Sequence, residues 1–101
     1  LQTKLCLLIQ VAKGLRALYI RNILYLNLKN SNVVVGKNLG CQLSDMSYAI
    51  VLKAEQEDVE APARYLTRFD MSTPEVSDHR YSRKTDVYFM GKLMLAVLLN
   101  L

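Results

Sequence analysis

The sequence predicts an α+β fold that is mainly helical and forms one small domain. Two observations indicate long helices: apolar residues recur at helical spacing over residues 2–19, and a second apolar stretch runs from Thr85 to Leu101. A third observation indicates a small sheet, because residues 33–35 and 41–43 are short strand-like runs on either side of a glycine-containing loop. With 101 residues, 51% of them hydrophobic, the chain is long enough for one domain of this kind.

The first predicted helix covers residues 2–19. Leu7 and Val11 widen its apolar face, so we expect much of this helix to be buried. Gly14 costs about 1 kcal/mol relative to Ala inside a helix, and Asn22 is a suitable residue for the helix end. The apolar side chains at intervals of three and four residues are Leu5, Leu8, Ile9, Ala12, Leu15 and Leu18.

The middle of the chain predicts a β-hairpin followed by loops. Two glycines and an Asn in residues 36–40 favour a tight connection between the strands 33–35 and 41–43. Residues 53–64 are polar and acidic and end in Ala-Pro, which predicts a mobile loop. Residues 73–75, Thr-Pro-Glu, predict the start of a short helix with the Thr as its cap.

The second long helix is predicted from Thr85 to Leu101. Ser82 or Thr85 is suitable as its cap, and the negative charge of Asp86 in the first turn suits the helix dipole. Apolar residues occur on nearly all sides of this helix, so we expect other protein segments to enclose it.

Charge and cysteine content exclude several classes of protein. The net charge is +4, but the basic residues are scattered, so the sequence does not predict nucleic-acid binding. Cys6 and Cys41 form neither a disulfide framework nor a zinc pattern, and we expect both to be buried thiols in a reducing compartment. The longest apolar stretch, residues 89–99, is interrupted by Lys92 and is shorter than the roughly 20 residues that span a bilayer.

Two segments fit a known catalytic pattern. Residues 23–32 read Ile-Leu-Tyr-Leu-Asn-Leu-Lys-Asn-Ser-Asn, and residues 45–47 read Asp-Met-Ser. They match the protein-kinase motifs H-R-D-L-x-x-x-N and D-F-G without a gap. Residues 73–75 stand for A-P-E, and residues 86–91 stand for the D-V-Y-S-F-G start of the central helix. The chain therefore resembles the first half of the large lobe of a eukaryotic protein kinase, in a degenerate, pseudokinase-like form.

The resemblance covers residues 1–101 and implies a partial C-terminal lobe of the kinase fold. Its expected parts are two long helices, a small β-hairpin and an activation-type loop, without the small lobe. That lobe carries the glycine-rich loop and the strand lysine that hold the nucleotide phosphates. The likeness is strongest to the tyrosine-kinase and tyrosine-kinase-like groups, although Leu28-Lys29 resembles the serine/threonine-type loop and leaves that ancestry open.

Asn27 is at the position of the catalytic Asp, the general base of the family. An amide cannot accept the substrate proton, and loss of a general base typically costs about 10²–10⁴ in rate. The resemblance thus implies a chain without phosphotransferase activity. Lys29 matches a position that contacts the transferred phosphate, and its alternative role is that of a solvated lysine. Leu26 replaces the Arg that pairs with a phosphorylated activation loop.

Asn32 and Asp45 match the side chains that hold magnesium in the family. One carboxylate and one amide leave a Mg-ATP site chemically conceivable, because magnesium takes hard oxygen ligands together with phosphate and water. The alternative is that both side chains only satisfy the local backbone. We expect no cofactor in the isolated chain.

The neighbouring positions have structural roles in the family. Tyr25 replaces the His of the loop with another bulky ring, which we expect to stack with Met46. Met46 replaces the Phe of D-F-G and can fill the same hydrophobic slot. Ser47 replaces the Gly and is disfavoured if the backbone there requires a positive φ.

Two acidic residues match anchor positions. Asp86 matches a buried carboxylate that accepts hydrogen bonds from the catalytic-loop amides. Glu75 matches an acid whose Arg partner lies further along the family sequence, so here we expect it to be exposed or to pair with Arg80 or Arg83.

These inferences leave two functions open. The first is a truncated kinase-like domain that acts as an interaction module, since its apolar helices predict an exposed surface for a protein partner or for self-association. The alternative is a fragment of a larger tyrosine-kinase-like enzyme with ATP-binding and protein phosphorylation activity. In either case we expect a cytoplasmic location, or the cytoplasmic part of a larger receptor.

Overall fold

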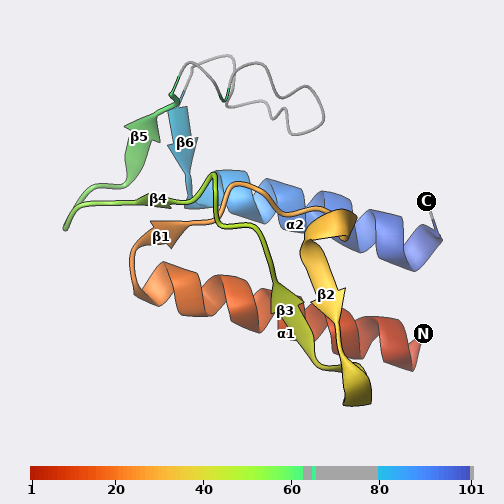
Figure 1. Cartoon of the computed structure of the whole chain (residues 1–101). Coiled ribbons are helices and arrows are strands. Elements are labelled where there is room, and N and C mark those ends of the chain that lie inside the picture. Colours follow the sequence, from red (N-terminus) through yellow and green to blue (C-terminus); the bar gives the residue numbers. More distant parts are fainter. Residues whose placement is uncertain (63–64, 66–79, 101) are drawn as a thin grey trace.

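The structure is a computed structural model that describes residues 1–62, 65 and 80–100 (Figure 1). Two long helices, α1 (Gln2–Ile20) and α2 (Arg83–Leu99), lie alongside each other, and the strands form small pairs around them. The predicted pair of long helices is therefore confirmed, with α2 beginning two residues before the expected start.

Three antiparallel pairs of short strands occur in the described residues. The predicted hairpin is confirmed as β2 (Val33–Val35) and β3 (Cys41–Leu43), with Val33 opposite Leu43. In its connection Asn38 adopts φ 62, the left-handed conformation that Asn tolerates. This hairpin lies against α1.

Two strand pairs were not predicted. Strand β1 (Ile23–Leu24) pairs with β4 (Ile50–Val51), and β5 (Asp58–Glu60) pairs with β6 (Arg80–Ser82). The prediction of a mobile loop over residues 53–64 was wrong for β5, because its partner strand is distant in the sequence and its three residues are too few for an alternating pattern to be recognised. The expected helix start at residues 73–75 and most of the activation-type loop lie outside the described residues.

Helix α1 ends as expected, but it is less buried than expected. The N–H of Asn22 donates to the carbonyl of Tyr19 at 2.9 Å, and Asn22 adopts φ 59. Only one face of α1 is buried, through Leu8, Val11 and Leu15. Cys6 is exposed, so the prediction that both thiols are buried was wrong for Cys6. Cys6 precedes Leu8 by two residues and therefore lies roughly 200° around the helix from that buried side chain.

Helix α2 begins with a capping box. The Ser82 side chain accepts a hydrogen bond from the N–H of Lys84 at 3.1 Å, and Thr85 Oγ1 accepts one from the N–H of Ser82 at 3.0 Å. This chain covers α2 on one side only, so the prediction that its apolar helices leave an exposed surface is confirmed for α2. Its buried face carries Phe89 and Leu93, whereas these apolar side chains are exposed: Val87, Tyr88, Met94, Leu95 and Leu99.

The segment after β1 joins two apolar clusters. Tyr25 and Leu28 belong to a cluster between the two long helices, whereas Leu24 and Leu26 belong to a second cluster beneath the strand pairs. Residues 24–28 are no more than 2% exposed. Their alternation between the two clusters holds this short non-helical segment in place. The remaining members of the clusters are Leu8, Val11, Leu15, Phe89 and Leu93 in the first, and Leu52, Ala61, Tyr65 and Tyr81 in the second.

Candidate functional site

Asp86 anchors the segment that matches the kinase catalytic loop. Its two carboxylate oxygens accept hydrogen bonds from the backbone N–H groups of Tyr25 and Leu26, each at 2.8 Å. The side chain is completely buried. Burial raises the pKa of Asp86 to about 6, and the two backbone hydrogen bonds oppose that rise. The start of α2 thus fixes the start of the loop.

Leu26 is held in an unfavourable conformation at this anchor. Its φ is 61, a left-handed value that costs roughly 1–2 kcal/mol for a residue with a side chain. The hydrogen bond to Asp86 and the burial of Leu26 in the second apolar cluster hold it there. This strained residue immediately precedes Asn27, the position that matches the catalytic base.

Asn27 and Asn32 lie in a buried polar network. Asn27 is 1% exposed, and its Nδ2 donates a long hydrogen bond of 3.4 Å to the backbone carbonyl of Asp45. The carbonyl of Asn27 accepts from Asn32 Nδ2 at 2.7 Å, and the carbonyl of Asn32 accepts from the N–H of Ser44 at 2.9 Å. The fold thus brings together residues 23–32, which match the catalytic-loop motif, and the segment after β3.

Tyr25 also links these two segments. Its hydroxyl donates a hydrogen bond to the carbonyl of Ser44, and burial raises the pKa of Tyr25 to about 12, so the hydroxyl keeps its proton. The expected stacking of Tyr25 with Met46 stays a prediction. Tyr25 is buried in the cluster between the helices, whereas Met46 is 45% exposed and is not a member of that cluster.

Asp45 forms the turn that carries the exposed Met46. Asp45, and not Ser47, adopts the left-handed conformation, with φ 58. Its Oδ1 accepts hydrogen bonds from both the N–H and the hydroxyl of Ser47. These bonds close a tight turn around residue 46, and they lower the pKa of the exposed Asp45 carboxyl.

The sequence interpretation had overlooked Ser44 and Ser47 as partners. An Asp followed by Ser two residues later is itself a turn signal, so the role of Ser47 was readable from the sequence. The role of Ser44 was not, because it depends on Asn32 and Tyr25, which approach it only in the folded chain.

The oxygen donors of Asp45 and Asn32 fit only part of a magnesium site. The exposed, ionised carboxylate of Asp45 is a suitable hard ligand, and Asn32 has its amide nitrogen bonded to Asn27, which leaves its oxygen as the group able to ligate. In the described part of the chain, no three His, Cys, Asp or Glu side chains gather in a metal-binding arrangement. The set therefore fits an ion that keeps waters and phosphate oxygens as its other ligands, and magnesium held there would supply positive charge that offsets the charge of a phosphate.

Lys29 and Glu75 complete the set of predicted site residues. Lys29 is half-buried and close enough to contribute to the lowered pKa of Asp45. Glu75 lies outside the described residues. Its two suggested partners are engaged elsewhere: Arg80 pairs with Asp58 at 2.6 Å, and Arg83 donates to Asn22 Oδ1 at 3.1 Å.

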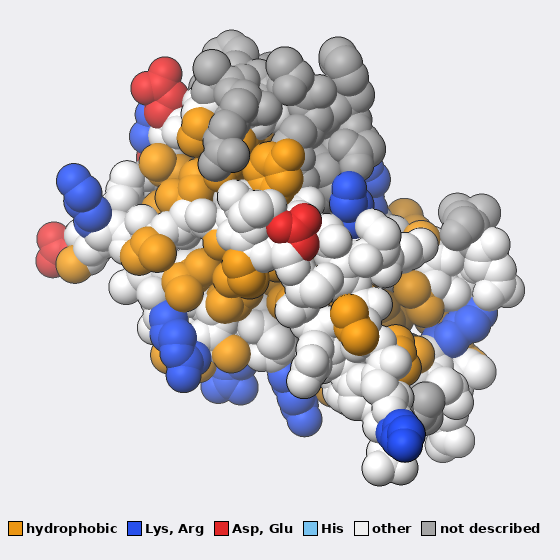
Figure 2. Space-filling view, viewed as in Figure 1, with side chains coloured by type: hydrophobic (Ala, Val, Ile, Leu, Met, Phe, Trp, Pro, Cys, Tyr) orange, Lys and Arg blue, Asp and Glu red, His pale blue; other side chains and the backbone are white. Residues whose placement is uncertain are grey.

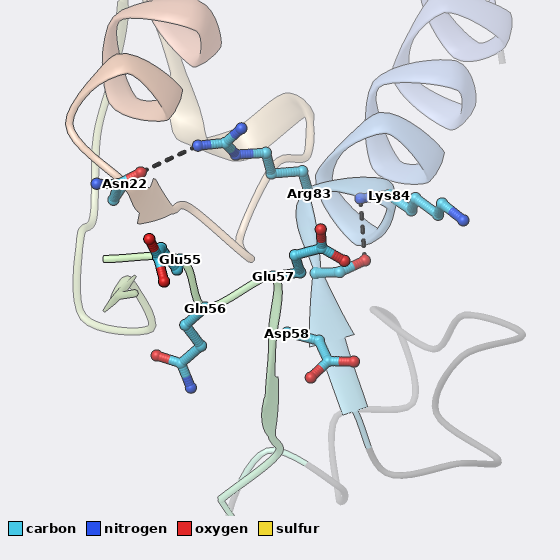
Figure 3. Close-up of a pocket in the computed structure, with 8 residues that line it drawn as sticks. Asn22, Glu55, Gln56, Glu57, Asp58, Arg83 and Lys84 are labelled. Atoms are coloured by element: carbon cyan, nitrogen blue, oxygen red, sulfur yellow. Dashed lines mark hydrogen bonds between the residues drawn. The ribbon is translucent and has the colours of Figure 1, made fainter. Parts of the chain in front are cut away.

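A large polar pocket lies away from this network, between the end of α1, the segment before β5 and the start of α2 (Figure 3). Its lining mixes charges of both signs, including Glu57, Asp58 and Lys84. Arg83 spans one side of it to reach Asn22. No residue of the buried polar network lines this pocket, so it is not the candidate site.

A family model described as protein tyrosine and serine/threonine kinase matches residues 1–100. The chain belongs to this kinase family. The recognition of a protein-kinase segment from its ordered motifs is thus confirmed.

Several members of the kinase family are similar to this chain. A mouse protein, tyrosine-protein kinase Srms, is 30% identical over 87% of the chain and 18% of its own length. An Arabidopsis thaliana protein named as an inactive leucine-rich repeat receptor-like serine/threonine-protein kinase is 33% identical over 96% of the chain and 16% of its own length. An Arabidopsis serine/threonine-protein kinase-like protein is 29% identical over 89% of the chain and 25% of its own length.

This kinase-family chain thus spans at most a quarter of these relatives. In the part of the chain that the structure describes, no helix combines the length and the apolar character needed to cross a bilayer.

Proposed function

We propose that this chain is part of the large lobe of a kinase domain and transfers no phosphoryl group itself. One observation carries the proposal: where the family has its general base, the chain has Asn27, and this amide is buried and donates to the Asp45 carbonyl. A donor amide has no basic site for the substrate proton. As part of this proposal, the chain resides in the cytoplasm.

A phosphoryl-transfer assay tests this proposal. The purified chain is incubated with radiolabelled ATP, magnesium or manganese, and generic tyrosine and serine substrates, beside the variants Asn27→Ala and Asp45→Ala. We expect the same background from all three proteins. Transfer by the unmodified chain that both substitutions abolish would falsify the proposal, and far-UV circular dichroism verifies that each variant is folded.

We further propose that the exposed face of α2 serves as the interaction surface. Residues 87, 91 and 95 are four apart and therefore align along the helix, with Tyr88 and Leu99 beside them. The apolar members are 40–60% exposed: Val87, Tyr88, Met94, Leu95 and Leu99. On the side of the molecule that Figure 2 draws, Lys and Arg side chains are scattered between groups of hydrophobic side chains. An apolar helix stripe suits an apolar partner face or a second copy of the chain.

Sedimentation velocity over a range of concentrations tests the α2 surface. We expect the unmodified chain to self-associate as its concentration rises, and Leu95→Glu to weaken this association. Ile9→Glu is the matched control, because Ile9 is comparably exposed but lies on α1. A monomer at every concentration, or equal effects of both substitutions, contradicts the proposal.

A second candidate function is nucleotide binding by a larger tyrosine-kinase-like enzyme of which this chain is a segment. The observation that favours it is the exposed, ionised Asp45 carboxylate, which interacts with the charge of Lys29. If this segment retains the site, millimolar Mg-ATP raises its melting temperature, and Asp45→Ala abolishes the rise. An unchanged melting temperature counts against binding by this segment.

A further inference from the structure

Cys6 and Cys41 are far apart in the sequence but belong to two elements in contact, α1 and β3 (Figure 1). The side chain of Gln10 contacts both of them. Its Nε2 donates to Cys6 Sγ at 3.7 Å, and its Oε1 accepts from the backbone N–H of Cys41 at 2.9 Å. The two ends of a single carboxamide thus bridge the two cysteines. Cys6 is exposed and Cys41 is half-buried.

We propose that Cys6 and Cys41 are a redox modification site. A low-molecular-weight disulfide oxidises them to an intramolecular disulfide, and thiols reduce that bond again. Cys6 and Gln10 are one turn apart on α1, and the Gln10 carboxamide links the Cys6 sulfur to the backbone of Cys41. A disulfide requires Cα atoms within about 7 Å. Because the Gln10 carboxamide contacts both cysteines, disulfide closure requires this side chain to turn aside and exchange its two hydrogen bonds for water.

The order of reaction follows from accessibility. The exposed Cys6 thiolate attacks one sulfur of oxidised glutathione, forms a mixed disulfide and releases one glutathione thiolate. The Cys41 thiolate then attacks the Cys6 sulfur and expels the second glutathione thiolate. Overall the two protein thiols lose two protons and two electrons, and one oxidised glutathione becomes two reduced ones. Burial, and then the neighbouring Cys6, raises the pKa of the Cys41 thiol, so the second step is the slower one near neutral pH.

Closure ties α1 to the strand that leads into the candidate site. Strand β3 is followed directly by Ser44 and Asp45, which carry the contacts to Tyr25 and Asn27. The bond also closes a long loop in the unfolded chain, which reduces the freedom of the unfolded state. We therefore expect the oxidised chain to melt at a higher temperature than the reduced chain.

The reaction of the full reduced chain with excess oxidised glutathione tests the proposal. After alkylation of the remaining thiols, intact mass spectrometry should show a monomer lighter than the reduced chain by two hydrogens, without alkyl or glutathionyl groups. Peptide mapping should link the Cys6 and Cys41 peptides. Cys41→Ser should stop at the chain carrying one glutathionyl group, and Cys6→Ser should react much more slowly.

The variant Gln10→Ala gives a readout specific to this geometry. Removal of the side chain between the cysteines should raise the rate of closure severalfold, whereas Gln42→Ala should leave it unchanged. Gln42 is the matched control because it is an exposed Gln next to Cys41 in β3. Circular dichroism of the reduced variants verifies that they are folded. The proposal is overturned if the unmodified chain stops at the mixed disulfide, forms only disulfide-linked dimers, or does not react.

Discussion

Replacement of Asp86 by Asn tests the anchor that joins α2 to the loop. Asn has nearly the same size as Asp but carries no charge at any pH. In the folded chain the carboxylate accepts two backbone hydrogen bonds, yet burial still raises its pKa from 3.8 to about 6. Tyr19 and Tyr25, the titratable groups that interact with it, stay neutral in this range because their own pKa values are raised.

The sign of the pH dependence follows from this raised pKa. Between about pH 4 and about pH 6 the folded chain binds more protons at Asp86 than the unfolded chain does, so protonation stabilises the fold. The contribution is fully present below the unfolded pKa and is lost as the pH rises through the folded pKa. With about 1.4 kcal/mol for each pKa unit, the loss between about pH 4 and about pH 7 amounts to about 2 kcal/mol.

Urea denaturation of both chains, followed by far-UV circular dichroism at several pH values, measures this contribution. All other titrating groups are common to both chains, so they cancel in the difference between the two free energies of unfolding. We expect the unmodified chain to lose about 2 kcal/mol relative to Asp86→Asn between about pH 4 and about pH 7. A constant difference, or one that grows in favour of Asp86 with pH, refutes the reasoning. Carboxyl NMR titration gives an independent value for the pKa.

Three further substitutions have expected outcomes. Tyr25→Phe removes the hydrogen bond to the Ser44 carbonyl and should lower the free energy of unfolding by about 1–3 kcal/mol, because that carbonyl loses its partner; a value within the error of urea denaturation contradicts this. Ser82→Ala removes the cap of α2 and should cost about 1 kcal/mol, with Ser82→Gly costing less; equal losses argue against capping. Leu15→Ala leaves a cavity in the cluster between the helices and should cost about 2–5 kcal/mol, whereas Ala17→Gly on the exposed side of α1 should cost about 1 kcal/mol; a reversed order of the two melting temperatures contradicts the assigned face.

Much of the architecture could be predicted because its signals are local. The spacing of apolar residues located both long helices, and the glycines and Asn of residues 36–40 located the hairpin between β2 and β3. Motif order and spacing identified the kinase family, which the match over residues 1–100 confirms. The helices, the hairpin and each single motif are determined by residues that are close together in the sequence, so a single sequence is sufficient to recognise them.

The other features depend on contacts between distant parts of the chain. Only the fold shows that Leu26 is held left-handed by Asp86, that the Ser44 carbonyl accepts a hydrogen bond from Tyr25, and that Met46 is exposed. The short pairs of β1 with β4 and of β5 with β6 carry too few residues for periodicity to reveal them. The sequence by itself determined the helices, the hairpin and the amide at position 27. Tertiary structure decided that this amide is buried as a donor, because the partner that binds it comes from a segment 18 residues away.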